Sequence, residues 1–169
     1  LGEAGLTPVV DGGRGFDHGV FVPLKLMYPA GGIPVVQLSL LHGLDPAAHL
    51  TMGRALVRLH AENLLVVGSG FSYHNLRSFF MPPDPGVDRA NDAFQDWLIE
   101  TCCDASLARE EREERLLRWA DAPSARLVHP REEHLLPLHV CCGMADGPAE
   151  CRFDDVVLGK RSVGFHWKY

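Results

Sequence analysis

Histidines are the residues of this chain whose type and position offer most for chemistry. The 169 residues include 9 of them, and an imidazole can bind a divalent metal or move a proton near neutral pH. His74 follows the apolar run 64–67 and the turn Gly68-Ser69-Gly70. Ligands of parallel α/β sheets bind at the carboxyl ends of the strands. This position is therefore as typical of a site residue as of a histidine that only bonds to the loop backbone.

A second pair of histidines stands in the segment His129-Pro130-Arg131-Glu132-Glu133-His134. On one continuous helix, side chains five residues apart point about 140° away from each other, so the His-Glu-x-x-His geometry of zinc proteases is absent. If Pro130 begins a helix, His129 lies in the preceding loop and His134 in the second turn, and both can face one cleft. By spacing alone, this pair is a weak indication of a metal site.

His18 lies in the segment Phe16-Asp17-His18-Gly19. A histidine beside a carboxylate and a glycine suits general acid–base catalysis, although the local pattern fits a residue at a helix start somewhat better. The other histidines have no comparable context and are interpreted as surface or helix-face residues: His42, His49, His60, His139 and His166.

Two common catalytic loops are not supported by the sequence. A dinucleotide-binding loop would need glycine at the position of Tyr73. Neither Ser69 nor Ser72 lies in the Gly-x-Ser-x-Gly pattern of a serine hydrolase. The 5 cysteines contain no Cys-x-x-Cys pair, and an odd number without a secretory signal indicates buried free thiols in a reducing compartment. We therefore expect a cytoplasmic protein.

Composition and charge exclude further classes. Hydrophobic residues make up 46% of the chain and charged residues 22%, which is the balance of a globular protein. The formal net charge of −6 disfavours binding to the nucleic-acid backbone. No apolar stretch approaches the length of a membrane span, so we expect neither nucleic acid nor a membrane as a partner.

The elements that position the histidines indicate an α/β fold. The apolar runs 33–40 and 64–67 are typical of buried central strands, and Asp45-Pro46 between them has the form of a helix start. Such a strand–helix–strand unit makes the two strands parallel. We expect one domain over residues 1–169, with a largely parallel central sheet, flanking helices, and C-terminal strands at 153–158 and 161–166 added at its edge.

Further helices are expected on both sides of this unit. Asp17 is a candidate cap for a helix that ends near Pro29, and Asp88 for a helix that continues to Cys102. The charged run 109–115 mixes signs at helical spacing, which is typical of a solvated, salt-bridged helix face. A helix from Pro130 through Cys142 would be bent at Pro137.

In their order along the chain, several segments resemble the class III extradiol ring-cleavage dioxygenases, specifically the DOPA-dioxygenase-like branch. The resemblance covers about residues 14 to 145. It rests on Gly15-Phe16-Asp17-His18-Gly19, Met27-Tyr28-Pro29, Ile33-Pro34-Val35-Val36-Gln37-Leu38-Ser39, Gly68-Ser69-Gly70 with His74-Asn75-Leu76-Arg77, and His129-Pro130-Arg131-Glu132-Glu133-His134-Leu135-Leu136-Pro137-Leu138.

The resemblance implies a metal-dependent oxidoreductase that cleaves the ring of a small catechol with O2. Iron(II) is the expected metal, and zinc(II) is an alternative that the family allows. By position in the motifs, His74 and His134 are the expected metal ligands, and His18 and His74 the expected catalytic residues. His129 and Asn75 are expected to bind substrate.

The chain departs from the family pattern at two further metal-ligand histidines. Family members carry these in an N-terminal Gly-His-Gly-x-Pro-like turn and a Ser-x-His-Trp-like strand end, and neither motif occurs in the 169 residues. We therefore expect the remaining ligands in an N-terminal portion that this chain lacks, and little turnover from the chain alone. The alternatives are an inactive remnant of the fold that acts as a binding or interaction protein and, with least support, a zinc-dependent hydrolase.

Overall fold

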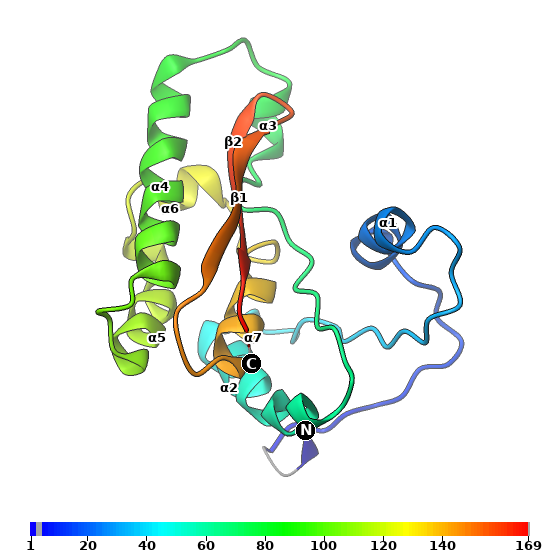
Figure 1. Ribbon diagram of the computed structural model, residues 1–169. Coiled ribbons are helices and arrows are strands. Elements are labelled where there is room, and N and C mark those ends of the chain that lie inside the picture. Colours follow the sequence, from blue (N-terminus) through cyan, green and yellow to red (C-terminus); the bar gives the residue numbers. More distant parts are fainter. Residues whose placement is uncertain (3–4, 169) are drawn as a thin grey trace.

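The computed structural model describes residues 1–2 and 5–168 and combines helices with one β-hairpin (Figure 1). The elements follow in the order α1 (His18–Met27), α2 (Pro46–Leu56), the 3-10 helix η2 (Val57–Ala61), α3 (Leu76–Phe79), α4 (Pro85–Cys103), α5 (Arg109–Leu117), the 3-10 helix η3 (Trp119–Asp121), α6 (Ala125–Val128), α7 (Leu136–Met144), β1 (Glu150–Val157) and β2 (Lys160–His166). Among the described helices, none is long and apolar enough to cross a membrane.

The C-terminal hairpin confirms the two strands predicted at the end of the chain. β1 and β2 pair antiparallel, with Val157 opposite Lys160. Leu158 and Gly159 form the turn with φ angles of 52° and 79°, as a two-residue hairpin turn of the I′ type requires. β2 packs against α4, where the Asn91 side-chain amide donates to the carbonyl oxygen of Arg161 at 2.8 Å.

The predicted parallel central sheet is not formed within the described residues, where the sheet consists of β1 and β2. Segments 33–40 and 64–67 are irregular, and most of their apolar side chains are exposed to solvent: Val36 is 93% exposed and Leu65 59%. A strand needs neighbouring backbone to accept and donate its hydrogen bonds. The strands predicted there from branched, apolar composition are therefore not formed, because composition does not supply the neighbouring strand.

Two apolar clusters form the core. One lies around α2, α7 and the end of α4, and the other lies between α4, α6 and β2. Glycines bring α2 and α7 together, because a Cβ atom on Gly53 would overlap the carbonyl oxygen of Val140 and one on Gly143 that of Leu50. The largest fully buried side chains are Trp119, Tyr73, Phe94, Leu50, Leu98, Leu116, Leu135, Leu136, Met144, His49, His129 and His139.

Aspartate caps begin three of the helices. Asp17 caps α1 and Asp45 caps α2, as the sequence predicts. α4 begins one turn earlier than expected, since Asp84 accepts from the Gly86 N–H and Pro85 occupies the first helical position. The pattern Asp-Pro marks this start better than Asp88 does.

The helix predicted from Pro130 is wrong in its start. α7 begins at Leu136, and residues 130–135 form turns. Pro137 lies in the first turn of α7, where its missing N–H needs no partner, so it begins the helix instead of bending it. His134 therefore lies just before α7 and not inside a helix.

The charged run in α5 is only partly solvated. Arg109 pairs with Glu113 at 3.1 Å, as helical spacing predicts, but Arg112 and Glu113 are buried. The Arg112 guanidinium donates to the carbonyl oxygens of Thr101 and Asp104, at 3.1 and 2.7 Å. Arg112 thus joins α5 to the last turn of α4, because those carbonyls have no partner within their own helix.

Candidate metal centre

His74, Glu133 and His134 come together at the surface of the second core cluster. Each offers one ligand atom, and these atoms all lie within 4.8 Å of one another. The imidazole rings of His74 and His134 stack with centroids 3.3 Å apart and planes inclined by 14°. Two residues that are 60 positions apart in the sequence therefore present their side chains to one point.

Backbone hydrogen bonds hold the His74 loop against the segment that carries His134. The Phe71 N–H donates to the carbonyl oxygen of His134 at 3.2 Å, and the His74 N–H donates to that of Val128 at 3.0 Å. The Ser72 hydroxyl accepts from the Val163 N–H at 2.8 Å, which ties the same loop to β2. The position of His74 is thus fixed from two sides.

The turn Gly68-Ser69-Gly70 permits this close approach. A Cβ atom on Gly70 would overlap the carbonyl oxygen of His134, and one on Gly68 would lie 2.6 Å from the Cys141 sulfur. Glycine is needed here because the loop backbone packs directly against the start of α7. The two glycines of this turn are therefore explained by packing.

His18 reaches the same region from α1. The Asp17 carboxylate accepts from the Gly19 N–H at 3.1 Å and from the Gln37 amide at 2.6 Å. A Cβ atom on Gly19 would lie 3.5 Å from the Ser69 hydroxyl oxygen, so the first turn of α1 lies beside the glycine turn. Asp17 is both a helix cap and an anchor that sets the position of His18.

Burial keeps the two stacked imidazoles neutral. The pKa of His74 is lowered mainly by desolvation, against an opposing effect of the Glu133 charge. The pKa of His134 is lowered by desolvation and by the neighbouring His74. His18 is close enough to lower both pKa values further. Neutral imidazole is the form that binds a metal.

Glu133 was not among the residues singled out in the sequence. Its carboxylate forms an ion pair with Arg131, with 2.7 Å between Nε and Oε2. No sequence signal marks it, because a helix was predicted from Pro130, and neighbouring side chains on a helix point about 100° apart, whereas residues 133–135 form a turn. In such a turn, neighbouring side chains can point to the same side.

The structure places His129 and Asn75 outside the cavity beside these residues. His129 is fully buried, with 0% exposure, and packs between Phe94 and Trp119. Its Nε2 lies 3.0 Å from the Ser72 carbonyl oxygen, and burial lowers its pKa to about 4. The Asn75 amide donates to the Leu127 carbonyl oxygen at 2.8 Å. Both side chains thus bond to backbone near His74 and do not line the cavity.

A cavity of about 850 Å³ opens beside the stacked histidines. Its lining residues are His18, Gly19, Val22, Pro23, Leu26, Ser69, Gly70, Phe71, His74, Leu76, Phe79, Phe80, His134 and Leu158. The cavity thus brings together His18, His74 and His134, the three histidines for which chemistry is expected.

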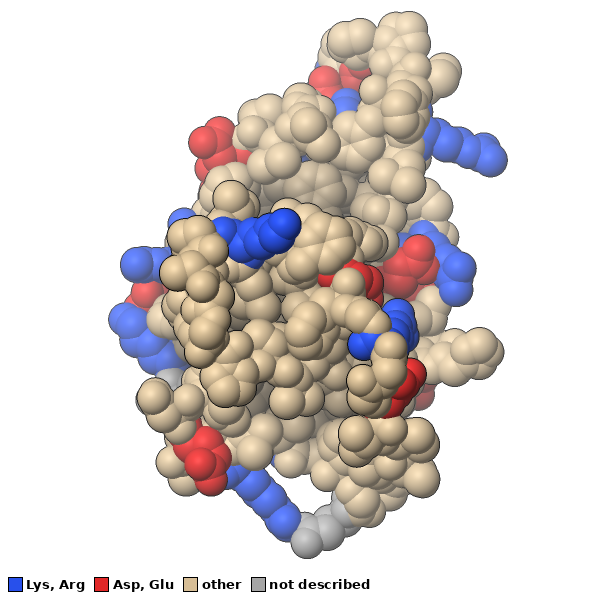
Figure 2. All heavy atoms as spheres, turned by 90° about the vertical axis from the view of Figure 1, so that its right-hand side faces the viewer, with Lys and Arg blue, Asp and Glu red and all other residues tan. Residues whose placement is uncertain are grey.

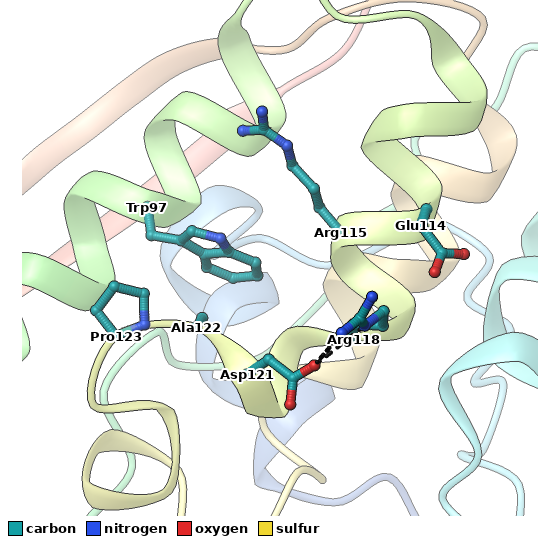
Figure 3. Close-up of a pocket in the computed structure, with 7 residues that line it drawn as sticks. All are labelled: Trp97, Glu114, Arg115, Arg118, Asp121, Ala122 and Pro123. Atoms are coloured by element: carbon teal, nitrogen blue, oxygen red, sulfur yellow. Dashed lines mark hydrogen bonds and ion pairs between the residues drawn. The ribbon is translucent and has the colours of Figure 1, made fainter.

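A smaller hollow of about 260 Å³ lies between α4, α5 and η3, beside Trp97 (Figure 3). Three of its four charged lining residues are paired: Arg118 with Asp121 at 3.0 Å, and Arg115 with Glu100 at 2.8 Å. Such exposed pairs are an ordinary surface feature, so this hollow offers no reactive group.

The donor set of the cluster fits a divalent metal. Two neutral nitrogens and one carboxylate oxygen are ligands that iron(II) and zinc(II) both accept. The Nδ1 atom of His134 is buried and has no hydrogen-bond partner among the described residues, and such an atom is costly unless something binds it. The Glu133 carboxylate, which pairs with Arg131, would add negative charge beside a bound cation.

The fold and the cluster therefore define a protein with a candidate histidine–carboxylate metal site beside an apolar cavity. Residues 1–161 match the model of the family described as the catalytic LigB subunit of aromatic ring-opening dioxygenase. The chain belongs to this family.

Two curated relatives carry more specific names. The chain is 40% identical over 166 residues to "Dioxygenase tasH" of Hapsidospora irregularis, a match that covers 94% of this chain and 51% of the relative. It is 41% identical over 133 residues to "4,5-DOPA dioxygenase extradiol" of Beta vulgaris, covering 78% of this chain and 47% of the relative. The chain thus spans about half the length of these relatives.

A solved structure shares the fold. The crystal structure of an uncharacterized protein from Escherichia coli K12 superposes with a TM-score of 0.73 at 31% sequence identity. The superposition covers 89% of this chain and 61% of that protein.

Proposed function

We propose that the whole protein is an extradiol dioxygenase that opens the ring of a catechol with O2. The observation that carries this proposal is the pairing of His74 and His134 beside Glu133, in a cavity that His18 also lines. Family membership and relatives named as dioxygenases support the same reaction. No observation favours a non-catalytic binding role or a hydrolase.

The residues of this chain would divide the work among them. His74, His134 and Glu133 would hold the metal, which when bound supplies Lewis-acid and redox chemistry for joining catechol and O2. His18 would accept the proton of a catechol hydroxyl and return it after the ring opens. The aromatic wall at Phe71 would hold the ring and exclude water from it.

Iron(II) is the proposed metal. In the reaction the ring is oxidised, O2 is reduced, and both oxygen atoms enter the product as a ring carbon–carbon bond breaks. Zinc(II) does not change its redox state in proteins, so zinc can occupy the same ligands without supplying that part of the chemistry. We propose that further ligands come from parts of the whole protein outside these 169 residues.

The test is turnover by the full-length protein. It is loaded with iron(II) without oxygen, mixed with a panel of catechols, and then exposed to air, while the yellow ring-opened product is followed by its absorbance. We expect product with iron and none with zinc. His74→Ala and His134→Ala should each lower the rate at least about 100-fold, whereas His42→Ala, at an exposed position, should not. Full activity of His134→Ala would contradict the proposal.

We also propose that the segments 33–40 and 64–67 are strands of a larger sheet in the whole protein. Most of their branched apolar side chains are exposed here, and the superposed protein from Escherichia coli has residues that this chain does not cover. Pairing with further strands would satisfy their backbone groups and bury their side chains.

A reducing compartment such as the cytoplasm is the proposed location. All five cysteines are free, and Cys102, Cys141 and Cys142 are buried in the core. Burial raises the pKa of Cys141 to about 11 and that of Cys142 to about 12, so these thiols are unreactive. Free core thiols are typical of proteins that are kept reduced.

A further inference from the structure

The cavity beside the metal centre is larger than a catechol ring requires. Its volume is about 850 Å³, whereas a cavity of roughly 150 Å³ is enough to hold benzene. Pockets for drug-sized molecules measure roughly 300–1,000 Å³. The space therefore suits a ring that carries a substantial substituent.

Helix α1 forms one wall of the cavity, and the lining residues follow the axis of this helix. His18, Val22 and Leu26 all line the cavity, and residues four apart lie on the same helix face. At 1.5 Å per residue, Leu26 lies about 12 Å along the axis from His18. An apolar track thus leads from the catalytic end of α1 away from the metal centre.

The opposite wall is aromatic and aliphatic. Phe71 and Phe79 stack with ring centroids 6.4 Å apart, and Phe79 meets Tyr73 edge to face at 5.5 Å. At the rim, Phe80 is 88% exposed and Leu158, in the hairpin turn, 80%. Large apolar side chains that border a cavity in this way are typical of a ligand-binding surface.

Charge is missing from this part of the cavity. Among the described residues that line it, none is lysine, arginine, aspartate or glutamate. On the face that carries α1, charged side chains lie mainly around a broad uncharged area (Figure 2). Arg131, close to the cluster, is already paired with Glu133. A charged substituent would therefore gain no partner of opposite charge here, whereas an apolar substituent would cover the exposed side chains of Leu26 and Phe80, which is favourable.

We propose that the site selects catechols that bear an extended apolar substituent over catechols that bear a carboxylate or an amino-acid side chain. The catechol lies at the His18, His74 and His134 end, and the substituent extends along Val22 and Leu26. This proposal rests on the proposed dioxygenase function and adds the substrate class.

The test compares two catechols of similar length in the full-length, iron-loaded protein without oxygen. 4-Butylcatechol carries an alkyl chain, and 3-(3,4-dihydroxyphenyl)propionate carries a carboxylate in its place. Binding is measured by calorimetry, and both compounds are then tested for ring opening in air. We expect 4-butylcatechol to bind at least about tenfold more tightly.

Two variants locate the effect. Leu26→Lys places a cation at the far end of the track, on a residue that is 81% exposed and so tolerates the change. It should weaken binding of 4-butylcatechol and strengthen binding of the propionate, so that the ratio moves about tenfold. Val156→Lys is the matched control, because Val156 is exposed on β1 and does not line the cavity. It should leave the ratio unchanged.

The outcomes separate this proposal from the proposed function. Equal binding of the two compounds, or tighter binding of the propionate, with ring opening of both, would overturn the substrate class and leave the dioxygenase standing. An unchanged ratio in Leu26→Lys would show that α1 does not line the substrate path. Failure of the iron-loaded protein to open any catechol would overturn the proposed function, and this proposal with it.

Discussion

Single residues determine whether a metal can bind here, and Glu133 is the least expected of them. Its neighbours His74 and His134 are partly buried and have lowered pKa values, which favours the neutral form of both. Two neutral ligands leave the full charge of a divalent cation unbalanced. The Glu133 carboxylate supplies negative charge at the same point, and we propose it as a third ligand or a close electrostatic partner.

Glu133→Gln should therefore weaken metal binding about tenfold. The substitution keeps the shape of the side chain and removes the charge. Affinity is measured by titration of the protein with zinc(II) or cobalt(II). The matched control is Glu132→Gln, since Glu132 pairs with Arg126 at 2.8 Å and lies outside the cluster. Equal affinities of the two variants would show that Glu133 has no part in the site.

A second residue-scale prediction concerns His139, which is buried between the carbonyl oxygens of Leu116 and Leu135. Burial lowers its pKa from 6.5 to about 4. Below pH 6.5 the unfolded chain binds a proton at this position more readily than the folded protein does, so the free energy of unfolding falls as the pH drops from 6.5 towards 4. A shift of this size is worth about 3 kcal/mol.

Chemical denaturation of the metal-free protein across this pH range measures the effect. His139→Gln should flatten the dependence of the unfolding free energy on pH, because one protonation site is lost. His129, whose pKa is also lowered to about 4, accounts for part of the remaining slope. His42→Gln, at an exposed position, should leave the slope as it is. A slope that is identical in His139→Gln would contradict the assignment.

Among the elements, close contacts at glycine connect the core to the site. α7 begins directly after His134 and packs against α2 through Gly143 and Gly53. The turn Gly68-Ser69-Gly70, which precedes His74, also packs against the start of α7. Since interiors are close-packed, a displacement of α7 is transmitted to both histidines.

Gly143→Ala should destabilise the protein by about 1–3 kcal/mol. The new Cβ atom would overlap backbone atoms of Leu50, which cannot move without separating the helices. Gly147→Ala is the control, because a Cβ atom there meets nothing within 4 Å. Thermal unfolding of both variants measures the difference. Similar melting temperatures would mean that α2 and α7 are not held at this distance in solution.

Local sequence signals predicted most helices and the hairpin correctly, but the parallel sheet that they also predicted is not formed within the described residues. Asp17 and Asp45 cap the helices they were expected to cap, because a cap depends on residues within one turn. The start of α7 and the burial of Arg112 depend on contacts with distant residues, so local spacing misplaced both. Segments 33–40 and 64–67 have a strand-like composition, but pairing requires a partner that composition does not reveal.

For the whole molecule, the sequence brought His18, His74 and His134 into one hypothesis through a family resemblance, and the fold places all three around one cavity. Their spacing alone would not have done this, because 56 and 60 residues separate them along the chain. The placement of His129 in the core and of Glu133 in the cluster depends on the turn before α7. No local sequence pattern predicted this turn.

Iron-edge anomalous diffraction from crystals of the protein grown with iron(II) in the absence of oxygen tests the metal centre most directly. We predict one strong peak about 2.1 Å from a ring nitrogen of His74 and from a ring nitrogen of His134, with a Glu133 oxygen beside it. The peak should disappear in crystals of His134→Ala. An iron peak elsewhere, or none at this cluster, would contradict the account.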